Sequence, residues 1–153
     1  MTNENTLIQI IDRLNYAIII CDIDSNFISW NKKAEELISI KEDKANANAN
    51  LWKKYFNITN TDGSKVEIND YPIIKALNGK TTIGDRLIIT NENMKEPIVI
   101  SIDSFPVEEH NKIVGAVTVF SDISDRIKME KILDEVTDSF KHIKRYLENS
   151  LMA

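Results

Sequence analysis

Few side chains in this sequence have the types and spacing that catalysis or metal binding needs. The only cysteine, Cys21, stands in the apolar run YAIIIC, and the two histidines, His110 and His142, lie far apart along the chain. A metal site needs several clustered ligands, and none are found. Asp22 and Asp24 belong to DIDSN, whose composition is typical of a turn. The chain also lacks a phosphate-binding loop and a Gly-x-Ser-x-Gly motif, so we expect no enzymatic activity.

Length and composition narrow the class of protein further. The 153 residues are 42% hydrophobic and 28% charged, which suits one globular domain with additional helix. A net charge of −5 does not fit nucleic-acid binding, which needs a basic face. The lone cysteine favours a reducing compartment, and the longest apolar run is far short of the ~20 residues of a spanning helix. No positive segment typical of a signal peptide begins the chain. We therefore expect a cytoplasmic protein without membrane contact.

The first half of the chain alternates short helices with one hairpin. Residues 5–14 place apolar side chains on one helical face, and residues 16–31 read as two strands around a turn. Asn31 suits the N-cap of a helix over 32–40. Residues 41–50 are a polar connection, residues 51–56 form a helical turn and residues 60–70 form a loop. Pro72 and Gly79 bracket a further short helix.

The second half contains three strand candidates, at residues 81–90, 96–107 and 112–120, the last two joined by a hairpin at EEHN. The whole order predicts an α+β fold around a five-stranded antiparallel sheet. The strands alternate little between apolar and polar residues, so we expect both faces of the sheet to be covered. The short helices cover one face, and the N-terminal helix or a partner subunit covers the other.

From residue 122 onward the chain has the pattern of a coiled coil. Apolar residues recur at alternating steps of four and three over roughly three heptads. Such a helix is marginal alone in water, so we expect it to pair in a parallel homodimer. The alternative is that it folds back onto its own domain. The expected dimer seam also includes the N-terminal helix and consists of Leu7, Ile11, Leu14, Met129, Leu133, Val136, Phe140, Ile143 and Leu147.

Three stretches together resemble the PAS family of sensory domains. AIIICDIDSNFISWNKKAEEL resembles the family's opening strand, turn, strand and N-x-x-A-x-x-L helix. DGSKVEINDYPIIKALNGK resembles its central segment, and VGAVTVFSDISDR resembles its closing strand and Asp-Ile-Thr signature, with Ser124 in place of Thr. The resemblance covers about residues 5–126. It implies an amphipathic helix at 1–14, a PAS sensor domain at 15–124 and a signalling helix at 125–153.

The resemblance also implies an apolar ligand pocket and a relay. The expected pocket residues are Ile19, Cys21, Leu37, Ile74, Leu77, Ile100, Ile102, Ser104, Ala116, Thr118 and Phe120. This lining would suit a small neutral or weakly polar ligand, and the alternative is a filled core without a cavity. Asp122, Ile123 and Ser124 would relay a strand movement into the helix, because a capped hinge without glycine transmits motion. The alternative is a simple strand end and helix start.

No cofactor can be assigned from these residues. The reactive Asn-Cys-Arg motif of covalent flavin binders is absent, and neither histidine lies where a haem ligand is expected. The alternatives are a flavin stacked non-covalently on Trp30 or Trp52 and a small organic ligand. His142 is followed by Ile143, which is atypical of a phospho-accepting histidine.

The sequence thus predicts a PAS module that senses a ligand or redox state and passes it through a dimeric helix. Its output domain would be a histidine kinase, a cyclase or a transcription regulator. The heptad pattern is still running near the end, at LENSLMA, so we expect the chain to be part of a longer protein. The alternatives are a ligand-free dimerisation or interaction scaffold and, less favoured, a small enzyme.

Overall fold

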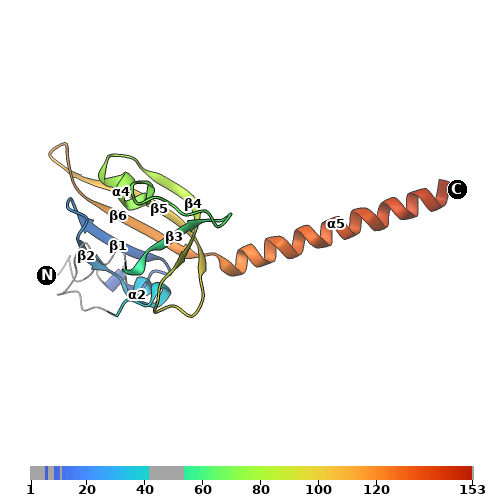
Figure 1. The fold of residues 1–153 in the computed structure, drawn as a ribbon, viewed down its shortest axis with the longest axis horizontal. Helices are drawn as coiled ribbons and strands as arrows, with labels where there is room; N and C mark the ends of the chain where they lie inside the picture. Colours follow the sequence, from blue (N-terminus) through green and yellow to red (C-terminus); the bar gives the residue numbers. More distant parts are fainter. Residues whose placement is uncertain (1–5, 7–8, 11, 42–53, 153) are drawn as a thin grey trace. The chain divides into compact units, whose positions relative to one another are not determined.

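The computed structural model describes residues 6, 9–10, 12–41 and 54–152. It divides into two compact units, Met1–Asp122 and Ile123–Ala153, and each unit is described by itself. Figure 1 traces the chain through both.

The first unit is built on one antiparallel sheet flanked by short helices, so the predicted α+β class is confirmed. Within the described residues the sheet has six strands where five were expected. From edge to edge they are β2 (Phe27–Trp30), β1 (Ala17–Asp22), β6 (Lys112–Asp122), β5 (Ile98–Glu109), β4 (Thr82–Thr90) and β3 (Asn57–Asn60).

The additional strand is β3, in a segment that the sequence analysis assigned to no strand. Ile58 lies opposite Ile89 of β4, and both side chains are buried. A turn around Gly63, whose φ is +89°, returns the chain so that Val66 N–H donates to Ile58 O at 3.3 Å. A four-residue strand has too short an apolar alternation to be recognised alone. Its pairing with β4, some thirty residues away, makes it a strand.

The β1–β2 hairpin and the helix after it were predicted correctly. Asp22 Oδ1 accepts from the N–H groups of Asp24 and Asn26 at 2.9 and 3.0 Å, which closes the turn. Asn31 is the N-cap of α2 (Lys32–Ile38), and its Oδ1 accepts from Ala34 N–H at 3.1 Å. The hairpin between β5 and β6 turns at His110 and Asn111, which have φ of 51° and 63°, as a two-residue turn requires.

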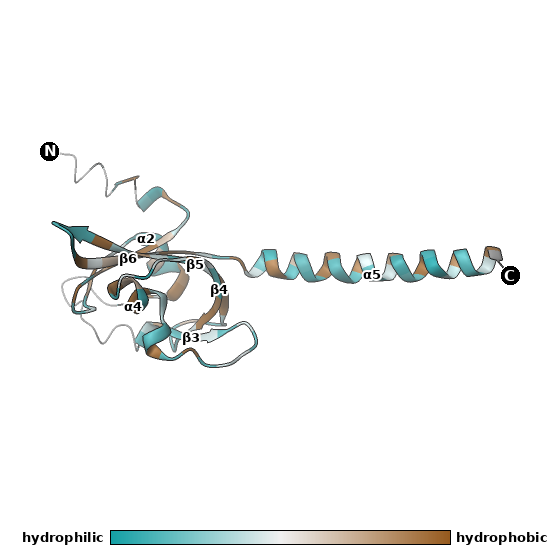
Figure 2. Cartoon of the chain, turned by 90° about the horizontal axis from the view of Figure 1, so that it is seen from above, coloured by the Kyte–Doolittle hydropathy of each residue, from teal (hydrophilic) through white to brown (hydrophobic). Residues whose placement is uncertain are grey.

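Short helices cover one face of the sheet. The 3-10 turn η2 (Ile68–Asp70) leads into α4 (Pro72–Leu77), with Pro72 at its first turn and Gly79 just beyond its end at φ +90°. α4 packs against β5 and β6, and α2 packs against β1. Figures 1 and 2 both show α4 over the sheet. The core lies between these helices and the sheet.

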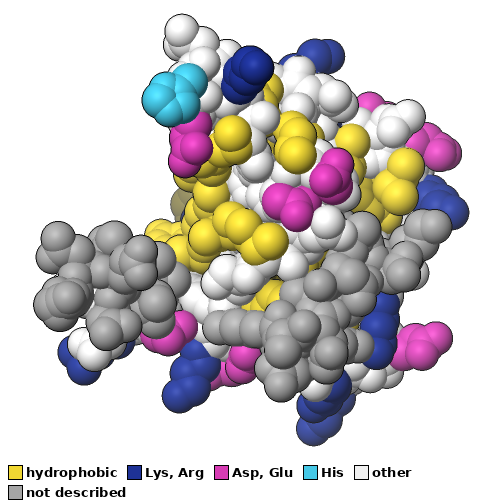
Figure 3. Space-filling model, turned by 90° about the vertical axis from the view of Figure 1, so that its left-hand side faces the viewer, with side chains coloured by type: hydrophobic (Ala, Val, Ile, Leu, Met, Phe, Trp, Pro, Cys, Tyr) yellow, Lys and Arg dark blue, Asp and Glu magenta, His cyan; other side chains and the backbone are white. Residues whose placement is uncertain are grey.

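The opposite face of the sheet is only partly covered. Ile18, Ile20, Val117 and Val119 are half-buried on that face, whereas Phe105 is exposed. Figure 3 shows a face of the protein on which hydrophobic side chains reach the surface between acidic ones.

Near the N-terminus, residues 9–10 and 12–13 are helical. Asp12 Oδ1 accepts from Lys32 N–H at 3.2 Å. The predicted seam residues Leu7 and Ile11 lie outside the described residues. Leu14, just past the helical residues, is exposed.

The second unit is the long helix α5 (Ser124–Met152). Its six predicted seam residues, from Met129 to Leu147, are each between 55% and 65% exposed. Figure 2 shows the apolar positions spaced along an otherwise hydrophilic helix. No helix among the described residues is long and apolar enough to cross a membrane.

Candidate functional site

The candidate site is the inner face of the sheet, where the predicted strand residues lie together. The eight strand members of the predicted pocket are at most 2% exposed; they are Ile19, Cys21, Ile100, Ile102, Ser104, Ala116, Thr118 and Phe120. The strand register explains this, because Thr118 lies opposite both Ile19 of β1 and Ser104 of β5. Side chains of directly paired residues point to the same face of a sheet. The predicted register is therefore the observed one.

Hydroxyl groups are the polar feature of this face: Ser104 and Thr118, with Thr82 of β4 also buried and paired opposite Ser104. Ser104 Oγ and Thr118 Oγ1 form a hydrogen bond between β5 and β6, and both residues are buried. Hydroxyl groups both donate and accept and carry no charge. They can therefore offer a hydrogen bond to a neutral group while remaining satisfied without it.

Aromatic side chains fill much of the space in front of the inner face. Phe56 makes edge contacts with Phe27 and Phe120 at centroid distances of 6.0 and 6.1 Å, and Phe27 also contacts Trp30 at 6.0 Å. Leu37, Ile74 and Leu77 are partly buried and pack against this core. Trp30 Nε1 donates to Glu35 Oε1 at 3.0 Å. Trp30 is thus a core residue, and Trp52 lies outside the described residues.

A small cavity of about 10 Å³ remains next to the hydroxyl pair. Of the predicted pocket residues only Ile102 and Thr118 line it, and its other walls are Phe56, Ile58, Tyr71, Pro72 and Ile73. This volume is about enough for one water molecule. The sequence analysis missed Phe56, Ile58 and Tyr71 because it placed Phe56 in a helical turn and Tyr71 at a helix start, and assigned Ile58 to no element. The alternation in YFNIT is the one local signal, and it is too short to specify a strand by itself.

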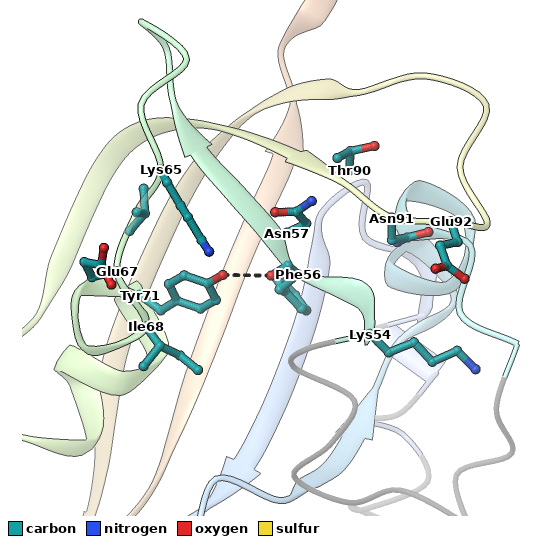
Figure 4. A pocket seen from close by; sticks show the side chains of 11 residues that line it. Lys54, Phe56, Asn57, Lys65, Glu67, Ile68, Tyr71, Thr90, Asn91 and Glu92 are labelled. Carbon is teal, nitrogen blue, oxygen red and sulfur yellow. Dashed lines mark hydrogen bonds between the residues drawn. The ribbon is translucent and has the colours of Figure 1, made fainter.

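A larger groove of about 790 Å³ lies outside the cavity, at the end of the sheet formed by β3 and β4 (Figure 4). Its floor is apolar and includes Phe56, Val66, Ile68 and Tyr71. Its rim is polar and is formed by Lys54, Asn57, Lys65, Glu67, Thr90, Asn91 and Glu92. Ligand pockets commonly fall in the range of about 300–1,000 Å³. Phe56 and Tyr71 line both the groove and the cavity.

Cys21 is placed for packing. Burial raises the pKa of its thiol to about 11, although a hydrogen bond with the backbone of Ala116 opposes this. The thiolate is the reactive form, so the thiol is inert near neutral pH. His110 occupies the β5–β6 turn and His142 is exposed on α5. No group of three potential metal ligands occurs in the described part of the chain.

The site connects to α5 through a single residue. β6 ends at Asp122 and α5 begins at Ser124, so only Ile123 separates them. Ile123 is buried, and its carbonyl accepts from Ile127 N–H at 2.9 Å.

Comparison with known proteins identifies the fold. The chain aligns with an RNA-binding light-oxygen-voltage receptor at a TM-score of 0.62 and 15% identity, covering 92% of this chain and 38% of that one. A PAS domain from Colwellia psychrerythraea matches at 0.55 and 20% identity, over 81% of this chain and 99% of that one. The PAS domain of nitrogen regulation protein NR(II) from Vibrio parahaemolyticus matches at a TM-score of 0.55 and 12% identity, over 76% of this chain and 97% of that one.

These likenesses show that the chain has the PAS fold, as the sequence resemblance implied. No family model and no curated protein matches the sequence. The chain spans less than half the length of the light-oxygen-voltage receptor.

Proposed function

We propose that this chain is a cytoplasmic sensory module that binds a small ligand in front of the inner face of its sheet. It relays occupancy through a dimer of α5 to an output domain, which is a histidine kinase, a cyclase or a transcription regulator. The observation that carries the proposal is the continuity of β6 with α5. β6 supplies Ala116, Thr118 and Phe120 to the inner face and is one residue from the helix.

The chemistry of the inner face supports a ligand over a thiol redox signal. Its side chains are apolar except for neutral hydroxyl residues, the Ser104–Thr118 pair and Thr82, which suits a small neutral or weakly polar molecule. Cys21, whose pKa is raised to about 11 by burial, is a poor redox sensor because little thiolate forms near neutral pH.

Ligand binding is tested by native mass spectrometry and thermal unfolding of protein from its natural host. A ligand at 100 times its Kd should add about 2.7 kcal/mol to the free energy of unfolding. Ser104→Ala should reduce this gain. Ser101→Ala is the matched control, since Ser101 lies on the same strand but on the opposite face. Equal effects of the two variants would count against binding at the inner face.

The relay is tested in a fusion of the chain to an output whose activity can be read. Asp122→Ala at the end of β6 should abolish the response to ligand while leaving ligand binding intact. Asp134→Ala, at an exposed position of α5, should leave the response unchanged. An undiminished response in Asp122→Ala would show that the junction between β6 and α5 takes no part in the relay.

Dimerisation is tested by measuring mass in solution over a range of concentrations. Phe140→Lys places a charge in the seam and should yield monomers, because a and d positions of a coiled coil are buried between the helices. Asp138→Lys, on the opposite side of the helix, should remain dimeric. A wild-type chain that is monomeric at all concentrations would favour a helix that folds back onto its own domain.

A ligand-free scaffold is the second candidate. It is supported by the aromatic cluster of Phe27, Phe56 and Phe120 and by the small size of the interior cavity. A scaffold would dimerise and bind a partner protein, but no small molecule would stabilise it.

A further inference from the structure

The outer groove and the inner cavity share two walls, and one side-chain hydrogen bond holds those walls together. Tyr71 Oη donates to the carbonyl oxygen of Phe56 at 3.0 Å, and both residues line the two spaces. Figure 4 shows this bond crossing between the tyrosine ring and the start of β3. Tyr71 is half-buried, so its side chain can reach the groove without unfolding the core.

The backbone of Tyr71 is fixed more firmly than its side chain. Its N–H donates to Ile68 O at 3.2 Å, and its carbonyl accepts from Lys75 N–H at 3.0 Å in the first turn of α4. The following residue, Pro72, restricts it further to an extended conformation, which is observed at φ −61° and ψ 134°. Opening between the two spaces therefore requires rotation of one side chain and no displacement of α4.

Phe56 is held in place from the other side. Its ring is buried and packs edge-on against Phe27 and Phe120, so its rotation would disturb the aromatic cluster. Tyr71 packs against the core but is only partly buried, whereas Phe56 is 2% exposed. Of the two shared walls, Tyr71 therefore moves at the lower cost. A neutral hydrogen bond contributes only about 1 kcal/mol net, so it breaks far more often than the whole unit unfolds.

We propose that Tyr71 is a gate through which ligands pass from the groove to the inner cavity. The groove is then the outer half of the ligand site. Rotation of Tyr71 joins the groove to the space at Ile102 and Thr118, which by itself holds about one water molecule.

The rim of the groove indicates which molecules enter. In Figure 4 Lys65 lies above the ring of Tyr71 and Asn57 lies across from it near Phe56, while Glu67 and Glu92 lie toward the two ends. Lys65 and the amide of Asn57 donate hydrogen bonds to carboxylates and carbonyls. The ligand class is accordingly a short molecule with an apolar end, which passes Tyr71, and a carboxylate end, which remains at the rim.

The gate is tested by the access of a small neutral thiol reagent, methyl methanethiosulfonate, to the cavity. Thr118→Cys places a thiol in the cavity wall, and the native Cys21 serves as an internal reference on the same face of the sheet. The labelling rate of each thiol is followed by peptide mass spectrometry. Adding Tyr71→Phe removes the hydrogen bond but keeps the ring, and should accelerate labelling at position 118 about fivefold, which corresponds to about 1 kcal/mol.

The matched control is Tyr55→Phe, which removes the hydroxyl that accepts from Lys41 N–H at 2.9 Å and does not line the cavity. It should leave the labelling rate at position 118 unchanged. Equal acceleration at position 118 and at Cys21 would mean general destabilisation and would overturn the gate. An unchanged rate in Tyr71→Phe would overturn it as well.

The ligand class is tested in the same assay with butanoate and butylammonium as competitors. Butanoate should slow labelling at position 118 more than butylammonium does, and Lys65→Met should abolish the difference. Equal or absent slowing would overturn the carboxylate assignment. The inference rests on the proposed ligand-sensing role, but labelling measures access alone, so a failed gate is distinguishable from a failed relay or dimer.

Discussion

Asn31 links three parts of the first unit, and its removal should destabilise that unit strongly. Its Oδ1 accepts from Ile18 N–H at 2.9 Å and from Ala34 N–H at 3.1 Å, and its Nδ2 donates to Tyr16 O at 2.8 Å. The residue is buried. Asn31→Ala therefore leaves two donors and one acceptor without their partner.

The cost can be estimated bond by bond. Loss of the N-cap costs about 1 kcal/mol, and each of the other two part-buried groups costs about 1 kcal/mol or more when left unpaired. The sum, about 3 kcal/mol, is a large share of the roughly 5–15 kcal/mol that stabilises a domain. For a unit of this size it corresponds to a fall in Tm of about 10 °C.

Urea unfolding followed by tryptophan fluorescence measures this cost, since Trp30 lies beside the site in the same unit and α5 contains no tryptophan. Asn31→Asp keeps both acceptor roles and should cost less than Asn31→Ala. Lys32→Ala, an exposed neighbour, should be nearly neutral. A cost below about 1 kcal/mol for Asn31→Ala at unchanged m-value would refute the reasoning.

Three further predictions concern β1 and its neighbours. A Cβ at Gly115 would clash with the carbonyl oxygen of Cys21, so Gly115→Ala should cost about 3 kcal/mol. At Gly63 the space is open but φ is +89°, so the control Gly63→Ala should cost about 1 kcal/mol. Similar costs of the two variants in urea unfolding would contradict this. Because burial raises the pKa of Cys21 to about 11, its alkylation in folded protein at pH 8 should be far slower than in urea, and equal rates would show that it is accessible. Burial raises the pKa of Asp22, but hydrogen bonds from Asn26 and Asp24 outweigh this and lower it from 3.8. The charged form thus favours the fold, and the stability advantage over Asp22→Asn should be present at pH 6 and lost as pH falls below 3.8; an advantage that persists in acid would refute the assignment.

Several local features of the fold could be predicted from the sequence because they depend on neighbouring residues. An Asx turn at Asp22, the N-cap at Asn31 and the helix between Pro72 and Gly79 each involve contacts within a few positions. The inner-face residues were also found, because the resemblance to PAS domains set the register and side chains alternate between the two faces along each strand. Thr118 and Ser104, which are paired between β5 and β6, were assigned to the inner face in this way.

The features that were missed depend on contacts between distant segments. β3 is a strand because β4 pairs with it, and its own four residues do not specify one. The size of the cavity depends on Phe27, Phe56 and Phe120, which come from three separate segments and meet edge-on. No periodicity in the chain encodes that meeting.

The sequence by itself thus determined the apolar stripe of α5 and the order of the elements apart from β3, since these are periodic or nearest-neighbour properties. Its resemblance to PAS domains indicated which face the predicted strands bury. The tertiary structure decided how much of the interior is filled and placed Tyr71 against Phe56 between two spaces. Packing of rings and closing of gaps are properties of side chains brought together from remote positions, so only the folded chain specifies them.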